Sequence, residues 1–234
     1  MKFQPYIGVD KWGVKEWEGI IYPPRTKGRY YLTHYAANFN SIELNATHYK
    51  LYDKDSVQKW NDAVPGKDFK FFPKMYKGIT HAESLTDKQA LLQEFFTSVS
   101  ELGEHLGRII IQLSNSFTTE GLRELKTFLE SLPLSNNYFI EFTNASWYKN
   151  DEPISVAKDL LPPHNNGIVY KDCRQLINKE LTLINKKAYV HFQGVGDTAT
   201  YILRLDYWLE QIADWTKEGI MAPKSHSYYC ILAI

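Results

Sequence analysis

Acidic side chains interrupt two short apolar runs of the sequence. Glu43 lies in the run Ser-Ile-Glu-Leu-Asn, and Glu141 lies in the run Phe-Ile-Glu-Phe. Two carboxyl groups at one site can serve as a general acid and a general base, the arrangement that glycoside hydrolysis uses. The alternative is that each carboxylate is a structural partner of a lysine or of a backbone donor. The distance between the two groups does not follow from the sequence, so neither a retaining nor an inverting outcome is assigned.

Two further side chains could take part in catalysis. Lys74 could neutralise a substrate anion, polarise a carbonyl group or form a Schiff base, and its alternative role is a salt bridge to a neighbouring glutamate. His191 could transfer protons near neutral pH, and its alternative role is that of a hydrogen-bonded core residue. The predicted catalytic residues are therefore Glu43, Glu141, Lys74 and His191.

Candidate substrate-binding side chains come from the same parts of the chain. Amide groups can donate hydrogen bonds to a polar substrate, and a loop histidine can join them. Three aromatic residues follow predicted strand ends, where their rings could stack on a sugar or a base, although loop packing is the alternative for each. The predicted substrate-binding residues are Asn45, Gln112, Asp172, His81, Trp12, Tyr49 and Trp147.

A metal centre is an alternative with less support. Glu141, Asp172 and His191 are predicted on consecutive strands and could together bind a divalent cation. The sequence contains no HExxH or HxH motif that would specify such a site. We therefore predict no metal and no cofactor, and a metal-dependent phosphoesterase or nuclease stays an alternative function.

Strand and helix patterns alternate along the chain. Helical periods predict helices at residues 29–39, 54–64, 91–106, 122–132 and 201–216, the last with a buried stripe of Ile202, Leu205, Leu209 and Ile212. This alternation implies parallel strands joined by crossover helices, and no GxGxxG or Walker motif indicates a nucleotide-binding sheet. We therefore predict an α/β fold, a (β/α)8 TIM-type barrel. Its eight predicted strands are residues 6–10, 40–45, 69–74, 108–113, 138–142, 167–172, 188–193 and 227–232.

Alternate residues of a barrel strand point into the barrel. When the aliphatic residues are placed on the helix-covered face, Glu43, Gln112 and Glu141 turn inward, as do Asn45 and His191. The same alternation predicts inward positions for Asp10, Lys74 and Asp172. All of them lie late in their strands, so we expect them at the carboxyl-terminal mouth, where barrel enzymes hold their active sites.

Several segments, taken in order, resemble one protein family. They are IGVDKWG at 7–13, FNSIELNATHY at 39–49, FFPK at 71–74, ITH at 79–81, QL at 112–113 and EF at 141–142. In this order they are similar to the YecE-like family, the domain of unknown function number 72, over most of the chain. The resemblance implies a TIM-type barrel and no particular reaction. Thr143 and His191 stand where the family pattern has arginines, which argues against carrying over an anion site.

The composition narrows the class of protein. The 27 basic and 27 acidic residues give zero net charge, which argues against nucleic acid or an anionic membrane as a general partner. Two cysteines and no long apolar run predict a cytoplasmic protein without a membrane span. No linker divides the sequence, so residues 1–234 are predicted to form one domain. The connection from Asp172 to Lys187 is only weakly helical in pattern, so we expect a barrel that is irregular after its sixth strand. Few residues follow the last predicted strand, so we also expect it to lack its final helix.

Together these observations favour an enzyme, a hydrolase that applies general acid/base chemistry to a small polar substrate at the barrel mouth. A carbohydrate-like substrate fits the aromatic residues and the balanced charges better than a strongly anionic one. The alternative is a barrel that binds a ligand or a regulatory partner and catalyses no reaction.

Overall fold

The computed structural model describes residues 5–64, 66, 68–133, 137–149, 152–161, 166–172, 188–193 and 197–217. The predicted strand at residues 227–232 lies outside this part of the chain. The other helices and strands, in chain order, are α1 (Tyr31–Asn38), β1 (Ser41–Leu44), α2 (Ala46–Tyr49), α3 (Lys54–Asp62), β2 (Lys70–Pro73), α4 (Lys77–Thr80), α5 (Gln89–Val99), β3 (Ile109–Gln112), α6 (Leu122–Ser131), β4 (Tyr138–Glu141), β5 (Tyr148–Lys149), β6 (Glu152–Pro153), α7 (Ser155–Leu160), β7 (Gly167–Asp172), β8 (Ala188–Phe192) and α8 (Thr198–Lys217).

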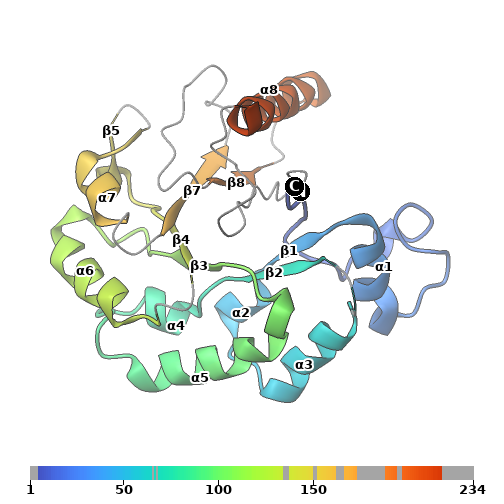
Figure 1. Ribbon diagram of the computed structural model, residues 1–234, viewed down its shortest axis with the longest axis horizontal. Coiled ribbons are helices and arrows are strands. Elements are labelled where there is room, and N and C mark those ends of the chain that lie inside the picture. Colours follow the sequence, from blue (N-terminus) through green and yellow to red (C-terminus); the bar gives the residue numbers. More distant parts are fainter. Residues whose placement is uncertain are drawn as a thin grey trace.

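Parallel strands form an arc through the middle of the molecule, and α1, α3, α5 and α6 lie outside it (Figure 1). β1 pairs with β2, and β3, β4, β7 and β8 form a second parallel ladder in that order. Single bridges from Phe71 to Leu106 and from Lys74 to Ile110 connect the two ladders. The α/β class with parallel strands is confirmed. Within the described residues the ladders do not close into a complete barrel.

The predicted first strand, residues 6–10, is not a strand in the structure. Its backbone donors are taken by side chains: Ile7 N–H donates to Asn40 Oδ1 at 2.6 Å, and Val9 N–H donates to Tyr35 Oη at 2.8 Å. One backbone bond, from Glu43 N–H to the Val9 carbonyl at 3.0 Å, holds the segment beside β1. The prediction was wrong because side-chain partners replace the strand ladder here.

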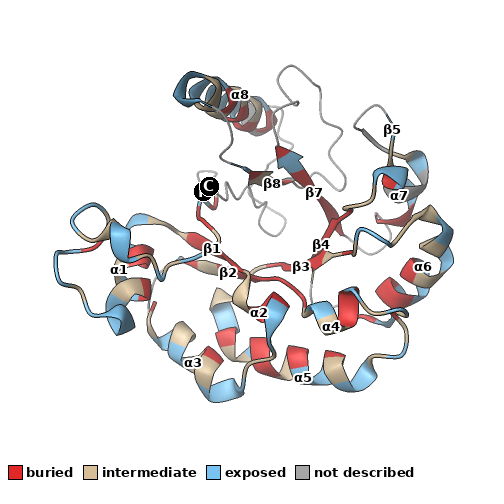
Figure 2. Cartoon of the chain, turned by 180° about the vertical axis from the view of Figure 1, so that it is seen from behind, coloured by how far each residue is buried: buried red, intermediate tan, exposed pale blue. Residues whose placement is uncertain are grey.

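Two apolar clusters define the two faces of the strands. The larger cluster lies between strands and helices, and it gives the buried surfaces of the helices in Figure 2. The smaller cluster contains the residues of the inner face, which are Tyr6, Phe72, Ile110, Phe139, Val169 and Tyr189. Because side chains alternate along a strand, the next inward residues are two positions later. They are Lys74, Gln112, Glu141, Lys171 and His191.

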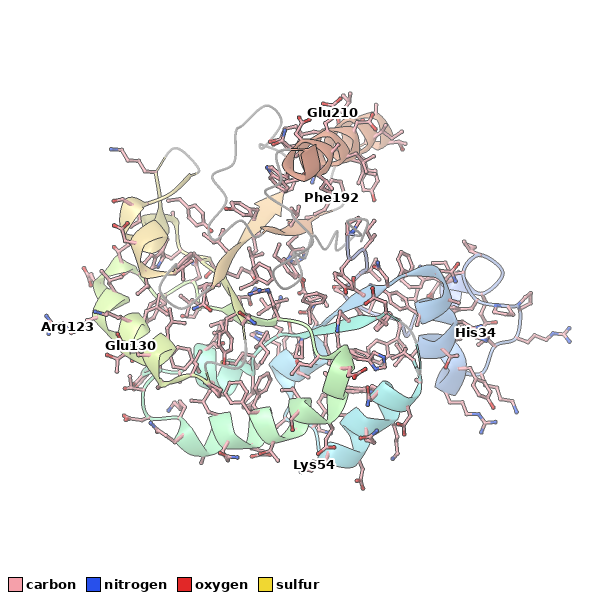
Figure 3. All side chains as sticks on the ribbon, viewed as in Figure 1. His34, Lys54, Arg123, Glu130, Phe192 and Glu210 are labelled. Carbon is pink, nitrogen blue, oxygen red and sulfur yellow. The ribbon has the colours of Figure 1, made fainter. Side chains whose placement is uncertain are left out.

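The long helix α8 is present as predicted, but its buried face differs from the predicted stripe. Ile202 and Leu209 are 51% and 59% exposed, whereas Arg204 and Trp208 are fully buried. Figure 3 shows Phe192 on the strand side of α8 and Glu210 on its outer side. The stripe was right for Ile212, which is buried, and wrong for Ile202 and Leu209, because α8 packs with a charged residue, Arg204, on its buried face. None of the described helices is long and apolar enough to cross a membrane.

Arg204 is buried because it pairs with Asp172 at the end of β7. Its Nε donates to both carboxylate oxygens of Asp172, at 3.0 and 3.1 Å, and Trp208 Nε1 donates to Oδ2 at 2.7 Å. Asp172 therefore faces α8 and not the inside of the strand arc. The inward position predicted for Asp172 was wrong by one residue, since Lys171 takes that position.

Candidate functional site

Side chains of alternating charge meet on the inner face of the strands. Lys171 Nζ lies 2.5 Å from Glu141 Oε1, and Lys74 Nζ lies 3.7 Å from Glu141 Oε2. Lys74 Nζ also lies 2.7 Å from Glu43 Oε1, and the Tyr189 hydroxyl donates to Glu43 Oε2. We call these five residues the Glu–Lys network. It links β7, β4, β1 and β8 through Lys74, which directly follows β2, so the last described strand is joined through side chains to the first.

The network is buried at one end and accessible at the other. The side chains of Glu43 and Glu141 are 1% exposed and that of Lys74 is 5% exposed. The side chain of Lys171 is 43% exposed. A small molecule that approaches the carboxyl ends of the strands would therefore meet Lys171 first and Glu141 directly behind it.

The lysines keep Glu141 ionised in spite of its burial. Burial raises the pKa of this carboxyl group, but the charges of Lys74 and Lys171 and hydrogen bonds from Lys171 and Gln112 outweigh burial, so the pKa is lowered. Glu141 is thus a carboxylate at neutral pH and holds no proton to donate. In the free protein it can act as a hydrogen-bond acceptor or a base, and not as a general acid.

Lys74 and Tyr189 hold their protons for complementary reasons. Burial lowers the pKa of Lys74, but the charges of Glu43 and Glu141 outweigh it and raise the pKa above its ordinary value. Burial and the neighbouring Glu43 carboxylate raise the pKa of Tyr189 well above its ordinary value. A protonated amine is no nucleophile, so this geometry favours charge neutralisation by Lys74 over Schiff-base formation.

Two more predicted residues lie on the same face, and a third lies beside it. Gln112 is opposite Glu141 in the register of β3 and β4, and its side chain contributes to the lowered pKa of Glu141. His191 is opposite Lys171 in the register of β7 and β8. Asn45, directly after β1, donates from Nδ2 to Asp10 Oδ2 at 3.4 Å. Five residues that the sequence placed at strand ends therefore lie on one face in the structure: Glu43, Lys74, Gln112, Glu141 and His191.

The short helices α2 and α4 follow β1 and β2 and carry further polar groups. His48 Nδ1 is 2.9 Å from the Met75 carbonyl oxygen, and the His48 and His81 ring centroids are 5.1 Å apart. Tyr49 is 65% exposed, and Lys77 Nζ lies 5.0 Å from the centre of its ring. Of the three aromatic residues predicted to stack on a substrate, Tyr49 has the exposed ring.

The other two aromatic candidates are packed against the protein. Trp147 is fully buried, stacked on Phe142 at a centroid distance of 4.5 Å, and its Nε1 donates to the Phe117 carbonyl oxygen. Trp12 is half-buried and meets Trp60 edge to face at 5.9 Å. The stacking role predicted for Trp147 was wrong, because the loops after β3 and β4 fold over its ring.

The described residues do not assemble the metal centre that the sequence left as an alternative. Asp172 is turned toward α8, away from Glu141 and His191 on the inner face. No three His, Cys, Asp or Glu side chains in the described part of the chain are grouped as a metal site. The metal-dependent alternative therefore gains no support from this geometry.

Sequence reasoning missed three polar residues of the site: Lys171, Tyr189 and Lys77. The signal for Tyr189 was available, because it precedes His191 by two positions and so shares its face. Lys171 needed the pairing of β7 with β8, which sets Lys171 opposite His191. Lys77 lies in the short helix α4. The sequence has no helical period in this segment, so it was interpreted as a loop.

Comparison with known proteins identifies relatives over most of the chain. The UPF0759 protein YecE of Escherichia coli strain K12 is 27% identical over an alignment 234 residues long, gaps included. The alignment covers 90% of this chain and 81% of YecE. The UPF0759 protein YunF of Bacillus subtilis strain 168 is 27% identical over 154 residues, which cover 61% of this chain and 52% of YunF.

Solved structures show the same fold. A DUF72 family protein from Thermotoga maritima MSB8 superposes with a TM-score of 0.73 at 20% identity, covering 99% of this chain and 92% of that chain. A DUF72 family protein from Enterococcus faecalis V583 gives 0.70 at 19% identity, covering 98% and 89%. At these identities the likeness concerns the fold alone. Residues 6–233 match the family described as "Protein of unknown function DUF72", and the chain therefore belongs to that family, as its sequence segments predicted.

Proposed function

We propose that this chain is an enzyme that applies acid/base chemistry to a small polar substrate bearing hydroxyl groups. The observation that carries the proposal is the pair of Glu141 and Lys171, 2.5 Å apart, in which one partner is buried and the other is nearly half exposed. Parallel α/β folds bind their ligands at the carboxyl ends of the strands, where this pair lies. The Glu–Lys network contains two acidic and two basic side chains, so its net charge is zero. A site with zero net charge suits an uncharged hydroxyl group at the reacting position.

In this proposal the substrate activates its own base. A substrate oxygen that takes a hydrogen bond from Lys171 Nζ draws this ammonium away from Glu141. Burial, which is the largest single influence on Glu141, then acts against fewer opposing charges, and the pKa of Glu141 rises. The carboxylate becomes a stronger base beside the substrate hydroxyl, whose proton it accepts, and Lys171 stabilises the negative charge that develops on the oxygen.

Glu43 has a positioning role in the same proposal. One of its oxygens faces Lys74 and the other accepts the Tyr189 hydroxyl, so both oxygens already have partners inside the protein. This arrangement holds Lys74 against Glu141. Glu43 is therefore proposed to fix the position and charge of Lys74, and Glu141 to exchange the proton.

The test is a panel of glycosides and esters, some neutral and some with one acidic group, assayed with the wild-type protein and two variants. Glu141→Gln removes the base with little change in shape, and Glu130→Gln removes an exposed carboxylate on α6, whose side chain is 51% exposed. We expect turnover of at least one substrate that falls by roughly 100-fold or more in Glu141→Gln and is unchanged in Glu130→Gln. Equal turnover by wild type and a folded Glu141→Gln variant would refute the proposed base.

A second candidate function is ligand binding without catalysis. The observation that favours it is that Glu43, Lys74 and Tyr189 satisfy one another in the free protein, as a purely structural network would. The two functions separate in a capture experiment, in which the protein is incubated with a mixture of polar metabolites and analysed by mass spectrometry. A captured metabolite that is returned unchanged and in stoichiometric amount favours binding, whereas a new product favours the enzyme.

A further inference from the structure

A group of side chains on α2 and α4 has no role in the chemistry proposed above. Tyr49 at the end of α2 is 65% exposed, Lys77 begins α4, and His81 follows α4 directly. Lys77 Nζ lies 5.0 Å from the centre of the Tyr49 ring. We call Tyr49, Lys77 and His81 the α2–α4 rim, because both helices follow the carboxyl ends of adjacent strands, β1 and β2.

The rim carries the positive charge of Lys77, which no carboxylate of the described residues pairs with. Lys77 is exposed, and within the described part of the chain no carboxylate lies within ion-pair distance of it. Burial lowers the pKa of His81, and the charges of Lys77 and Lys74 lower it further, while Glu141 acts in the opposite direction. His81 therefore lies beside two ammonium groups and stays neutral in the free protein at neutral pH.

Contacts with buried neighbouring residues also hold the rim in place. The neighbouring His48 is buried, with its Nδ1 2.9 Å from the Met75 carbonyl oxygen and its ring centroid 5.1 Å from that of His81. The Thr80 hydroxyl lies 2.9 Å from His81 Nδ1. These contacts orient the His81 ring, and the backbone N–H of His81 donates to the Lys77 carbonyl oxygen at 2.8 Å, so the two residues are one helical turn apart.

The rim belongs to the same mouth as the Glu–Lys network. Lys74, which lies between Glu43 and Glu141, is close enough to Tyr49 for the two groups to influence each other electrostatically. Glu141 and Lys74 also act electrostatically on His81, in opposite directions. The rim and Glu141 are therefore both at the carboxyl ends of the strands and influence each other electrostatically.

We infer that the α2–α4 rim binds an anionic group, a phosphate or a carboxylate, at the far end of the substrate from the reacting hydroxyl. This inference rests on the proposed function, and it narrows the substrate class to sugars that carry one acidic group. The anion pairs with Lys77 and draws this ammonium off the Tyr49 ring, whose face then becomes free to stack on the sugar. His81 takes up a proton beside the anion and completes the pocket.

The test follows the His81 imidazole by NMR while the pH is varied, with the His81→Asn variant to assign its signals. The probes are inorganic phosphate, glucose 6-phosphate and gluconate, with glucose as the uncharged control. We expect glucose 6-phosphate or gluconate to saturate the site and to raise the pKa of His81 by about one pH unit. The cause is the negative charge of the bound anion a few ångströms from the imidazole. Glucose at the same concentration leaves the pKa of His81 unchanged.

Matched lysine variants show where the anion binds. Lys77→Met removes the rim ammonium, and Lys126→Met removes an exposed ammonium from α6, whose side chain is 63% exposed. We expect Lys77→Met to need at least a tenfold higher concentration of the anionic probes for the same response of His81. In Lys126→Met the concentration needed should be unchanged. A His81 that responds to none of the probes, or that responds equally in Lys77→Met, overturns the inference.

The outcome of this experiment does not depend on whether the proposed function is correct. It detects binding and requires no turnover, so Glu141→Gln serves as a further protein to titrate. If His81 responds to anions in this variant as in the wild type, the rim is a binding site whatever Glu141 does. If His81 does not respond although Glu141→Gln abolishes turnover, the substrate lacks the acidic group and the inference is wrong.

Discussion

Replacing Lys74 by methionine tests the Glu–Lys network most severely. The substitution keeps the length of the side chain and removes the ammonium that lies 2.7 Å from Glu43 and 3.7 Å from Glu141. Removing one partner of a buried ion pair costs about 3–5 kcal/mol, because the other charge stays buried without compensation. Glu141 keeps Lys171 and Glu43 keeps the Tyr189 hydroxyl, so we expect a loss of about 4 kcal/mol in the free energy of unfolding.

Urea denaturation at about pH 7 measures this loss. The control is Lys126→Met on the exposed face of α6, for which we expect a change within about 0.5 kcal/mol. Adding Glu43→Gln to Lys74→Met removes the carboxylate that lost its closest partner, and we expect it to recover about 2 kcal/mol. A Lys74→Met variant within about 1 kcal/mol of the wild type, or a double variant less stable than the single one, would falsify the reasoning.

The pH dependence of stability should change sign in the same variant. In the wild type the pKa of Glu141 is below its ordinary value of 4.5, so its contribution is complete above that pH and is lost as the pH falls through the folded-state pKa. In Lys74→Met, Glu141 loses the ammonium that most strongly opposes the effect of burial, and we expect its pKa to rise above its ordinary value. The folded variant then binds a proton that the unfolded chain does not, so we expect its stability to rise as the pH falls from about 7 to about 5.

Three further substitutions address single contacts. Tyr189→Phe removes the hydroxyl that donates to Glu43, and we expect a loss of about 1.5–3 kcal/mol in urea denaturation. Asp172→Asn leaves Arg204 buried with a neutral partner, and we expect a loss of about 3 kcal/mol with unchanged affinity for any ligand of the mouth, because this pair faces α8. Trp147→Leu should lower the free energy of unfolding by roughly 2–4 kcal/mol and leave ligand affinity unchanged in calorimetry, whereas a specific loss of affinity would restore the stacking role.

The strands and their inward residues could be predicted where polar and apolar residues alternate. Glu43 and Glu141 each lie between two apolar residues, so one choice of face buries the apolar neighbours under helices and turns the carboxylate inward. In β7 three apolar residues in a row precede Lys171 and Asp172, and alternation does not choose between the two charges. Arg204, 32 positions after Asp172, makes that choice by pairing with the outward carboxylate.

Loop aromatic residues could not be ranked from the sequence for a similar reason. Tyr49 and Trp147 both follow a strand end by a few residues, and their local sequences give no sign of different exposure. The ring of Trp147 is buried because Phe117 and Phe142 come from two loops to stack on it. The ring of Tyr49 stays exposed because its helix, α2, ends there and its neighbour across the rim is a lysine. Such contacts depend on residues distant in the chain.

The most direct test of the account is depletion of single compounds from a defined mixture of polar metabolites that includes neutral and acidic sugars. Wild type, Glu141→Gln and Glu130→Gln are incubated with the mixture, and substrates and products are quantified by mass spectrometry. We predict that wild type and Glu130→Gln convert the same sugar-like compound to a product, and that folded Glu141→Gln binds it without conversion. Conversion by Glu141→Gln at the wild-type rate, or a compound that the wild type binds and returns unchanged, would contradict the proposed enzyme.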